Sequence, residues 1–151
     1  MRQWVALKFE LEGDENLSRA LVNVGNRLKD YTEPLQKSAK LILRDVKVNF
    51  DTEGGLVGGW APLKESTIAG RIREGFGAGP ILQKTGRYKR SFKAEISSKK
   101  VIIGAFGVKY HKYHQSKAPR TKLPRRPTLF LRNETKSEIM REFQKYIRFN
   151  L

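Results

Sequence analysis

Two histidines with helical spacing are the first residues in the chain that could do chemistry. His111 and His114 stand three positions apart, so on a helix their imidazoles would share one face, as zinc ligands often do. A zinc site needs a third ligand, however, and the chain has no cysteine and no carboxylate between Glu95 and Glu134. The sequence therefore predicts that the two rings pack against aromatic neighbours, with no metal or cofactor.

The residues that could serve as nucleophile or acid–base catalyst are isolated from one another. No known nucleophile motif surrounds Ser91, and neither histidine lies near a carboxylate in the sequence. The acids Asp45, Asp51 and Glu53 belong to a predicted helix and its end, where polar faces need charge for solubility. A nuclease would need clustered acids to hold metal, and the basic middle of the chain lacks them. We therefore expect no catalytic residues and no enzymatic activity.

The basic middle of the chain is the more informative feature. From Gly75 to Asn133 there are fifteen Lys or Arg and a single acid, Glu95. Tyrosines and prolines are interleaved with seven of these basic residues, which are Lys109, Lys112, Lys117, Arg120, Lys122, Arg125 and Arg126. Point charges, stacking rings and extended backbone suit a phosphate chain, and docking on an acidic protein surface is equally consistent with them. In both cases a loop this charged is expected to lie exposed.

Length and composition limit what this basic segment can belong to. With 151 residues, 38% of them hydrophobic and 30% charged, the chain is expected to form one domain, 1–151, around a modest core. The net charge of +16 indicates a polyanion or an acidic surface as a neighbour. The absence of cysteine excludes a disulfide scaffold, and no stretch has the apolar length of a signal peptide or a membrane span. We expect a soluble protein made in the cytoplasm, with no membrane partner.

The hydrophobic periodicity predicts an α+β fold. Spacings of three and four predict helices over 14–50, as one kinked helix or two that restart at Thr32, over 65–73, and in the terminal segment, with Asn133 as the cap. Alternation predicts strands near 4–11, 91–97 and 100–106, the last two as a hairpin. The long helical segment and the terminal helix are expected to pack on a small antiparallel sheet. Two long segments interrupt these elements, the glycine-rich loop 51–64 and the basic loop 107–132, and their length predicts a role as interface arms.

The order of the landmarks resembles a known family. A Trp-x-Pro-Leu element at Trp60 is followed by Thr67, then by Leu82-Gln83-Lys84-Thr85-Gly86, by Tyr110 to Gln115, and by Pro124-Arg125-Arg126-Pro127 ahead of Phe130-Leu131. In this order and spacing the chain resembles the phage virion morphogenesis or tail completion proteins of tailed bacteriophages. The resemblance runs from the first predicted helix to the last.

What the resemblance implies is a structural role in the virion. The resemblance implies a homo-oligomeric ring, with a hexamer favoured. This ring would complete the tail, or join it to the neck, at the head–tail junction. The subunit would be made in the host cytoplasm before assembly. The implied partners are copies of the chain itself and neck, connector or tail-tube proteins, with genomic DNA as a further contact. The alternative function is that of a basic nucleic-acid-binding module, which rests on charge alone.

The candidate contact residues combine the two loops. Trp60, Pro62 and Leu63 are candidates from the glycine-rich loop, because a large rigid ring often anchors an interface. For Trp60 the second interpretation is a lid over the core of its own domain, and the sequence leaves both open. The candidates from the basic loop, for protein or DNA, are Lys109, Lys112, Lys117, Arg120, Lys122, Arg125 and Arg126.

Overall fold

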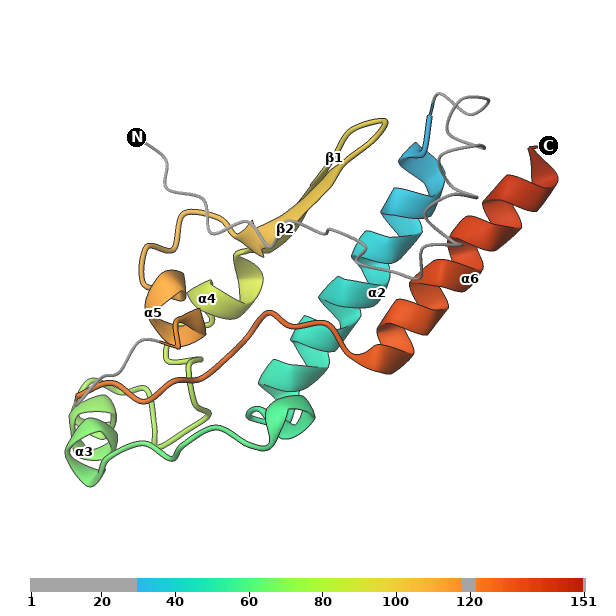
Figure 1. Ribbon diagram of the computed structural model, residues 1–151. Helices are drawn as coiled ribbons and strands as arrows, with labels where there is room; N and C mark the ends of the chain where they lie inside the picture. The colour runs from blue at the N-terminus through green and yellow to red at the C-terminus, as the bar shows by residue number, and fades with distance from the viewer. Residues whose placement is uncertain (1–29, 118–121, 151) are drawn as a thin grey trace. The chain divides into compact units, whose positions relative to one another are not determined.

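The long helix α2 (Thr32–Asp51) begins at the restart signal in the sequence. This computed structural model describes residues 30–117 and 122–150 (Figure 1). Asp30 Oδ1 accepts hydrogen bonds from the backbone nitrogen and the hydroxyl of Thr32, at 2.8 and 2.6 Å. Pro34 lies in the first turn, where a backbone N–H would have no helical partner. The predicted restart at Thr32 is confirmed, and the elements expected before it, including the strand near 4–11, lie outside the described residues.

One face of α2 is buried along its whole length. The apolar positions of this face are Leu35, Ala39, Ile42, Val46 and Phe50; Leu35 is half-buried, and each of the other four is at most 4% exposed. Their spacing of three and four places them on one stripe of the helix. The same face buries Asn49, whose side-chain amide donates to the carbonyl of Pro127 in the basic loop.

The described residues fall into two compact units, which we describe separately. Unit 1 consists of residues 30–42, 94–103 and 131–150. Unit 2 consists of residues 43–93 and 104–130. Helix α2 and the hairpin each run from one unit into the other.

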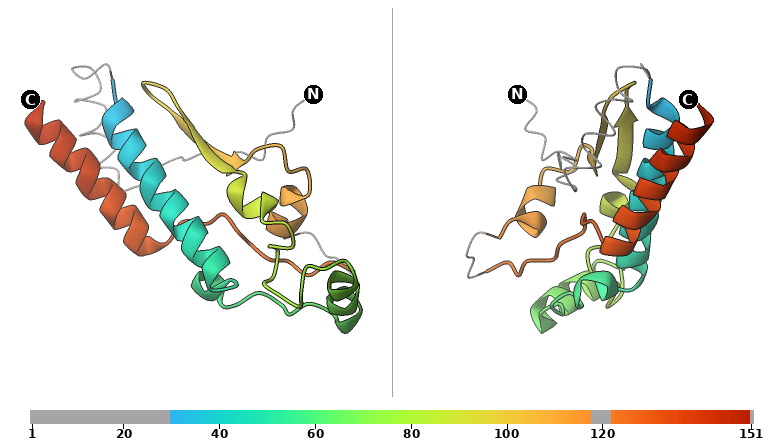
Figure 2. Two further views of the ribbon diagram at one scale, coloured as in Figure 1. Left: turned by 180° about the vertical axis from the view of Figure 1, so that it is seen from behind. Right: turned by 45° about the vertical axis from the view of Figure 1, so that its right-hand side comes forward.

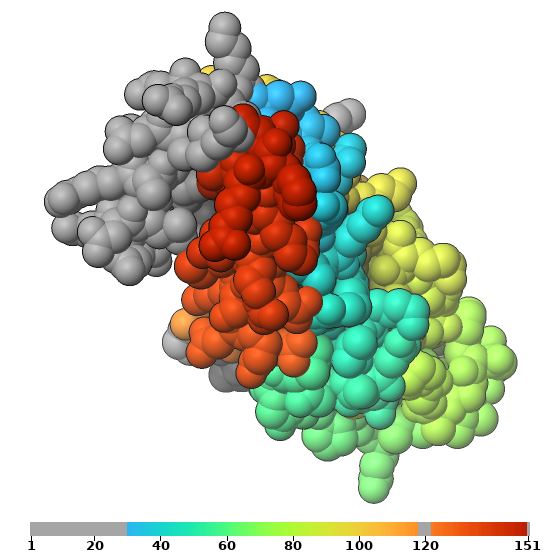
Figure 3. Space-filling view, turned by 90° about the vertical axis from the view of Figure 1, so that its right-hand side faces the viewer, coloured from blue at the N-terminus to red at the C-terminus, as the bar shows by residue number. Residues whose placement is uncertain are grey.

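Unit 1 pairs the first half of α2 with the terminal helix α6 (Asn133–Phe149), which runs antiparallel to it (Figures 1, 2 and 3). Ile139 of α6 is 1% exposed, and Tyr31 stacks obliquely on Phe143 and Tyr146 with centroids 6.2 and 6.4 Å apart. The Tyr146 hydroxyl donates to the carbonyl of Asp30 at 2.7 Å. The terminal helix is confirmed, and Asn133, expected as its cap, is instead its first residue.

The hairpin joins strands β1 (Phe92–Ile96) and β2 (Val101–Ala105) in a two-stranded sheet. Its turn closes through Ser97, whose backbone nitrogen donates to the carbonyl of Lys100 at 2.8 Å. Val101 and Ile103 alternate on the buried side of β2. Both predicted hairpin strands are therefore present, and the α+β fold class is confirmed.

Unit 2 carries the shorter elements. After α2 come the 3₁₀ turn η1 (Gly55–Val57) and the helices α3 (Glu65–Arg73), α4 (Arg87–Arg90) and α5 (His111–Gln115). Helix α3 matches the predicted bounds, whereas α4 is a helix that the sequence periodicity does not predict. Among the described residues, no helix has both the length and the apolar composition of a membrane span.

Candidate functional site

An aromatic cluster in unit 2 brings the landmark residues together. Phe50 lies at its centre and meets the rings of Trp60, Tyr88 and Phe92 edge to face, with centroids 5.3, 5.4 and 5.7 Å apart. Such edge-to-face pairs contribute about 0.5–1.5 kcal/mol each beyond the area they bury. The cluster therefore fixes the end of α2 against the glycine-rich loop and α4.

Trp60 belongs to this core. Its side chain is only 7% exposed, and its indole Nε1 donates to the carbonyl of Pro127 at 2.9 Å. The amide of Asn49 donates to the same carbonyl at 3.0 Å. Of the two interpretations left open by the sequence, the structure places the ring as a lid over its own unit, and little of its surface is left for another protein.

The glycine-rich loop is shaped to receive this ring. Gly54 has φ +90° and lies so close to Trp60 that a Cβ there would come within 2.7 Å of the Trp60 backbone nitrogen. Glu53 accepts a hydrogen bond from the backbone nitrogen of Ile81, and Gln83 donates to the carbonyl of Phe50 at 2.9 Å. Loop 51–64 is thus tied to its own unit at several points.

A buried polar network lies beside the aromatic cluster. The Tyr88 hydroxyl lies 2.7 Å from His111 Nδ1 and 2.8 Å from Thr128 Oγ1. Burial lowers the pKa of His111 to about 4 and raises the pKa of Tyr88, so at neutral pH both groups are uncharged. An uncharged imidazole can accept the phenolic hydrogen at Nδ1, and the network links α4, α5 and the end of the basic loop.

The Gln115 side chain joins α5 to the end of the basic loop by pairing with backbone groups, as a neighbouring strand would. Its side-chain oxygen accepts hydrogen bonds from the backbone nitrogens of Thr128 and Leu129, and its amide donates to the carbonyl of Leu129 at 2.7 Å. His111 and Gln115 stand four positions apart on α5 and so share one face. The aromatic packing predicted for the histidines is confirmed, since His111 packs on Phe92 and His114 on Tyr110. The described residues contain no group of acids and histidines that could hold a metal ion.

Arg126 departs from the expectation that the basic loop is exposed. Its side chain is 5% exposed, and it donates from Nε to the carbonyl of Ala61 at 2.9 Å and from Nη2 to that of Pro62 at 3.0 Å. Exposure was the wrong expectation here because the guanidinium satisfies two carbonyls of the glycine-rich loop, which offsets part of its desolvation. Burial also lowers its pKa.

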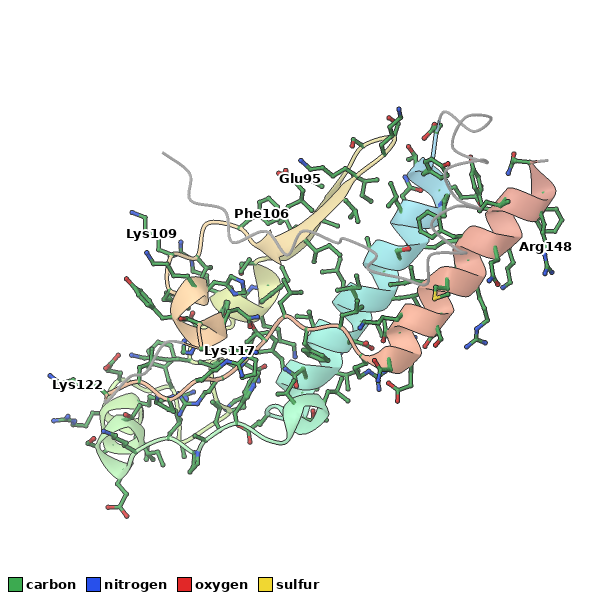
Figure 4. The ribbon with its side chains drawn as sticks, in the orientation of Figure 1. Glu95, Phe106, Lys109, Lys117, Lys122 and Arg148 are labelled. Atoms are coloured by element: carbon green, nitrogen blue, oxygen red, sulfur yellow. The ribbon has the colours of Figure 1, made fainter. Side chains whose placement is uncertain are left out.

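The other described basic residues of the loop lie on the surface. We call four of them, Lys109, Lys112, Lys117 and Lys122, the basic face. Lys112 lies on α5 and the other three lie before and after it in the sequence, and Lys109 and Lys122 reach outward from the ribbon (Figure 4). Arg125 is exposed as well, with its Nε donating to the carbonyl of Gln115 at 3.1 Å, while Arg120 lies outside the described residues. Pro62 is exposed and Leu63 half-buried.

The acids and the serine considered for catalysis all have structural partners. The Ser91 hydroxyl donates to the carbonyl of Tyr88 at 2.7 Å, and Asp45 is paired with Arg44 at 3.2 Å. Asp51 is paired with Lys47 at 2.7 Å and also with Lys89, and hydrogen bonds from these lysines lower its pKa. Each of these contacts therefore holds part of the fold.

Comparison with known proteins gives a family match, which covers most of the chain. The model of the phage virion morphogenesis family matches residues 13–148. The chain has no significant match among curated proteins or among solved structures.

Proposed function

The chain belongs to the phage virion morphogenesis family, and from that premise we propose that it forms a homo-oligomeric ring at the head–tail junction. Family membership gives the chain a role in virion assembly. The finer assignment is that of a structural, non-enzymatic subunit that completes the tail or joins it to the neck. We infer a hexamer from the family resemblance.

One observation carries this proposal. The landmark residues that define the resemblance make their contacts inside unit 2. There Trp60, His111, Gln115 and Arg126 hold two long loops against a rigid core. The basic loop turns charge outward, namely the basic face. A rigid core that presents exposed cations serves a subunit that must dock on neighbours.

The charge of unit 2 favours an acidic neighbour. Its sequence has seventeen Lys or Arg against five Asp or Glu. Three of those acids are paired with lysine or arginine of the same unit: Asp45, Asp51 and Glu74. The lysines of the basic face therefore keep a net positive field, which steers association with acidic partner rings.

DNA is the second candidate contact, favoured by two exposed rings. Tyr110 and Tyr113 are 42% and 44% exposed, and the Lys112 ammonium lies 5.0 Å from the centroid of the Tyr113 ring. Exposed rings among lysines are what backbone-tracking proteins use to bind nucleic acid. This supports a contact with the genome as it passes through the junction.

The test is native mass spectrometry of the purified protein, alone and with purified neck and tail components. We expect a closed ring, either alone or on addition of the components. A quadruple variant of the basic face, each lysine replaced by glutamine, should lose the partner complex. The matched control replaces Lys93, Lys99, Lys100 and Lys136 by glutamine and removes the same charge elsewhere. A protein that stays monomeric with every component would contradict the ring.

A further inference from the structure

Unit 2 contains a pocket that the proposed function does not use. It has a volume of about 450 Å³ and lies among α3, the segment that precedes α4, and the end of the basic loop. The lining residues that matter here are Leu63, Arg71, Leu82, Lys84, Leu123 and Arg126.

Two of the lining side chains are buried guanidinium groups. Arg71 and Arg126 are each 5% exposed, and within the described residues both donate to backbone carbonyls. Arg71 reaches the carbonyls of Pro80 and Gly79, each at 3.1 Å, and its buried Nε has no hydrogen-bond partner within the described part of the chain. Leaving a buried charged donor without a partner is unfavourable. Neither guanidinium forms a salt bridge with a carboxylate among the described residues.

The rest of the lining shows what could supply the missing partner. Glu74 is the acidic residue among the described lining, and its carboxylate is already paired with Lys84. Two guanidiniums and a lysine therefore face one carboxylate, and the pocket has excess positive charge. Its apolar lining consists of the side chains Leu63, Leu82 and Leu123, with the rings of Tyr88 and Tyr110.

The backbone at Leu82 also departs from the ordinary. Leu82 has φ +59°, a left-handed conformation that a bulky side chain seldom adopts. Strain of this kind is concentrated at sites that bind or switch. At Leu82 it accompanies a side chain that lines the pocket.

We propose that this pocket binds a short segment of a neighbouring virion protein in which a carboxylate stands next to an aliphatic side chain. The carboxylate meets the guanidiniums of Arg71 and Arg126, and the aliphatic group packs on Leu63, Leu82 and Leu123. A guanidinium binds a carboxylate through charge-assisted hydrogen bonds that remain strong when water is excluded. A nucleic-acid phosphate would meet the same charges but would leave the leucines without a partner. The identity of the partner as a virion protein rests on the proposed function, whereas the site itself does not.

The test uses two peptides that differ in one group. The probes are acetyl-Gly-Leu-Glu-Leu-Gly-amide and its glutamine counterpart, titrated into the full-length protein while amide NMR shifts are recorded. We expect the glutamate peptide to shift the resonances of Leu63, Leu82 and Leu123. Because a hydrogen bond to a charged group contributes about 1.5–3 kcal/mol, it should bind about tenfold more tightly than the glutamine peptide, or better.

Two variants with opposite expected effects on peptide binding test the charge of the pocket. They leave the buried arginines unchanged, because these hold loops in place. Lys84→Gln should weaken glutamate-peptide binding, and Glu74→Gln should strengthen it, each by about two- to fivefold, because an exposed charge contributes up to about 1 kcal/mol. Lys93→Gln, which removes a charge away from the pocket, is the matched control and should change nothing.

The outcomes separate this inference from the proposed function. Equal binding of the two peptides, or the same pocket shifts with inorganic phosphate or duplex DNA at equal affinity, would overturn it. A protein that forms the ring but does not discriminate between the peptides loses this inference alone. A protein that discriminates between them but forms no ring keeps the carboxylate site and loses the proposed function.

Discussion

The indole of Trp60 and the carbonyl of Pro127, 67 positions apart, are joined by a 2.9 Å hydrogen bond. This bond closes the glycine-rich loop onto the end of the basic loop. Asn49 donates to the same oxygen, so the carbonyl is shared between α2 and the loop. The two segments that the sequence offered as separate arms are thus mechanically connected.

Trp60→Ala should destabilise the isolated protein by about 3–5 kcal/mol, because a buried aromatic side chain leaves a cavity. Trp60→Phe retains a ring against Phe50 and loses the indole hydrogen bond, which should cost less. Urea unfolding followed by circular dichroism measures both. If Trp60→Ala were as stable as the wild type, the assignment of the ring to the core would be wrong, and the interpretation of Trp60 as an interface anchor would be favoured.

Arg126 and Arg125 offer a comparison of neighbouring residues with equal charge. Arg126→Gln removes charge-assisted hydrogen bonds to Ala61 and Pro62 and should cost about 1.5–3 kcal/mol of folding free energy. Arg125→Gln, at an exposed position, should stay within about 0.5 kcal/mol. Thermal or urea unfolding of the two variants side by side tests this, and equal stabilities would contradict the burial of Arg126.

Acid should weaken the fold through His111. Its pKa is about 4 in the folded protein and roughly 6.5 in an unfolded chain, so between these values the unfolded state binds more protons. Stability should therefore fall as the pH drops from about 6.5 to about 4, by at most about 3 kcal/mol, and level off below.

Urea midpoints across this pH range, for wild type and His111→Gln, measure the effect. The variant lacks the titrating ring, so its stability should depend less on pH. The carboxylates serve as the internal reference, because they contribute equally to both proteins. A variant with the same pH dependence as the wild type would assign the acid sensitivity to other groups.

Gly54 should tolerate substitution less well than Gly58, four positions later in the same loop. Both have φ near +90°, so alanine at either costs strain of about 1 kcal/mol or more. Only at Gly54 does the new Cβ also collide with Trp60, whereas nothing lies within 4 Å at Gly58. The melting temperature of Gly54→Ala should fall clearly further than that of Gly58→Ala, and equal losses would show that Trp60 can move aside.

The basic face should matter to binding and not to folding. Replacing Lys109, Lys112, Lys117 and Lys122 by glutamine should leave the melting temperature nearly unchanged, because each side chain is exposed. If these lysines contact DNA phosphates, each lost contact should reduce the salt slope of binding by about 0.9. A loss of the protein partner with an unchanged DNA slope would assign the face to protein docking.

Local patterns in the sequence predicted most of the elements. The start of α2 at Thr32, the bounds of α3 and the hairpin follow from capping and periodicity, which are properties of neighbouring residues. The four-residue helix α4 was missed because it is too short to show a period. Its signal is Gly86, whose φ of +69° marks the turn that precedes it.

The candidate site was harder to predict because its contacts are non-local. Arg125 and Arg126 are indistinguishable in the sequence, and only the carbonyls of Ala61 and Pro62, over sixty positions away, bury the second of them. The Tyr88 network likewise spans 23 and 40 positions to His111 and Thr128. Periodicity reports which face of an element is apolar, and it carries no information on which distant carbonyl a guanidinium will reach.

Gln115 and Arg126 hold both ends of segment 116–125 close together, through the bond from the Arg126 backbone nitrogen to the carbonyl of His114 at 3.2 Å and the bonds of Gln115 to Leu129. The bonds that join its two ends are made by residues at and beyond those ends, so they do not depend on the length of the segment. Doubling its length would add only about 0.6 kcal/mol of closure entropy. Insertions and deletions between the clamps should therefore be tolerated far better than substitutions at them, and a phage could refit this subunit to a different neighbour by exchanging this one stretch.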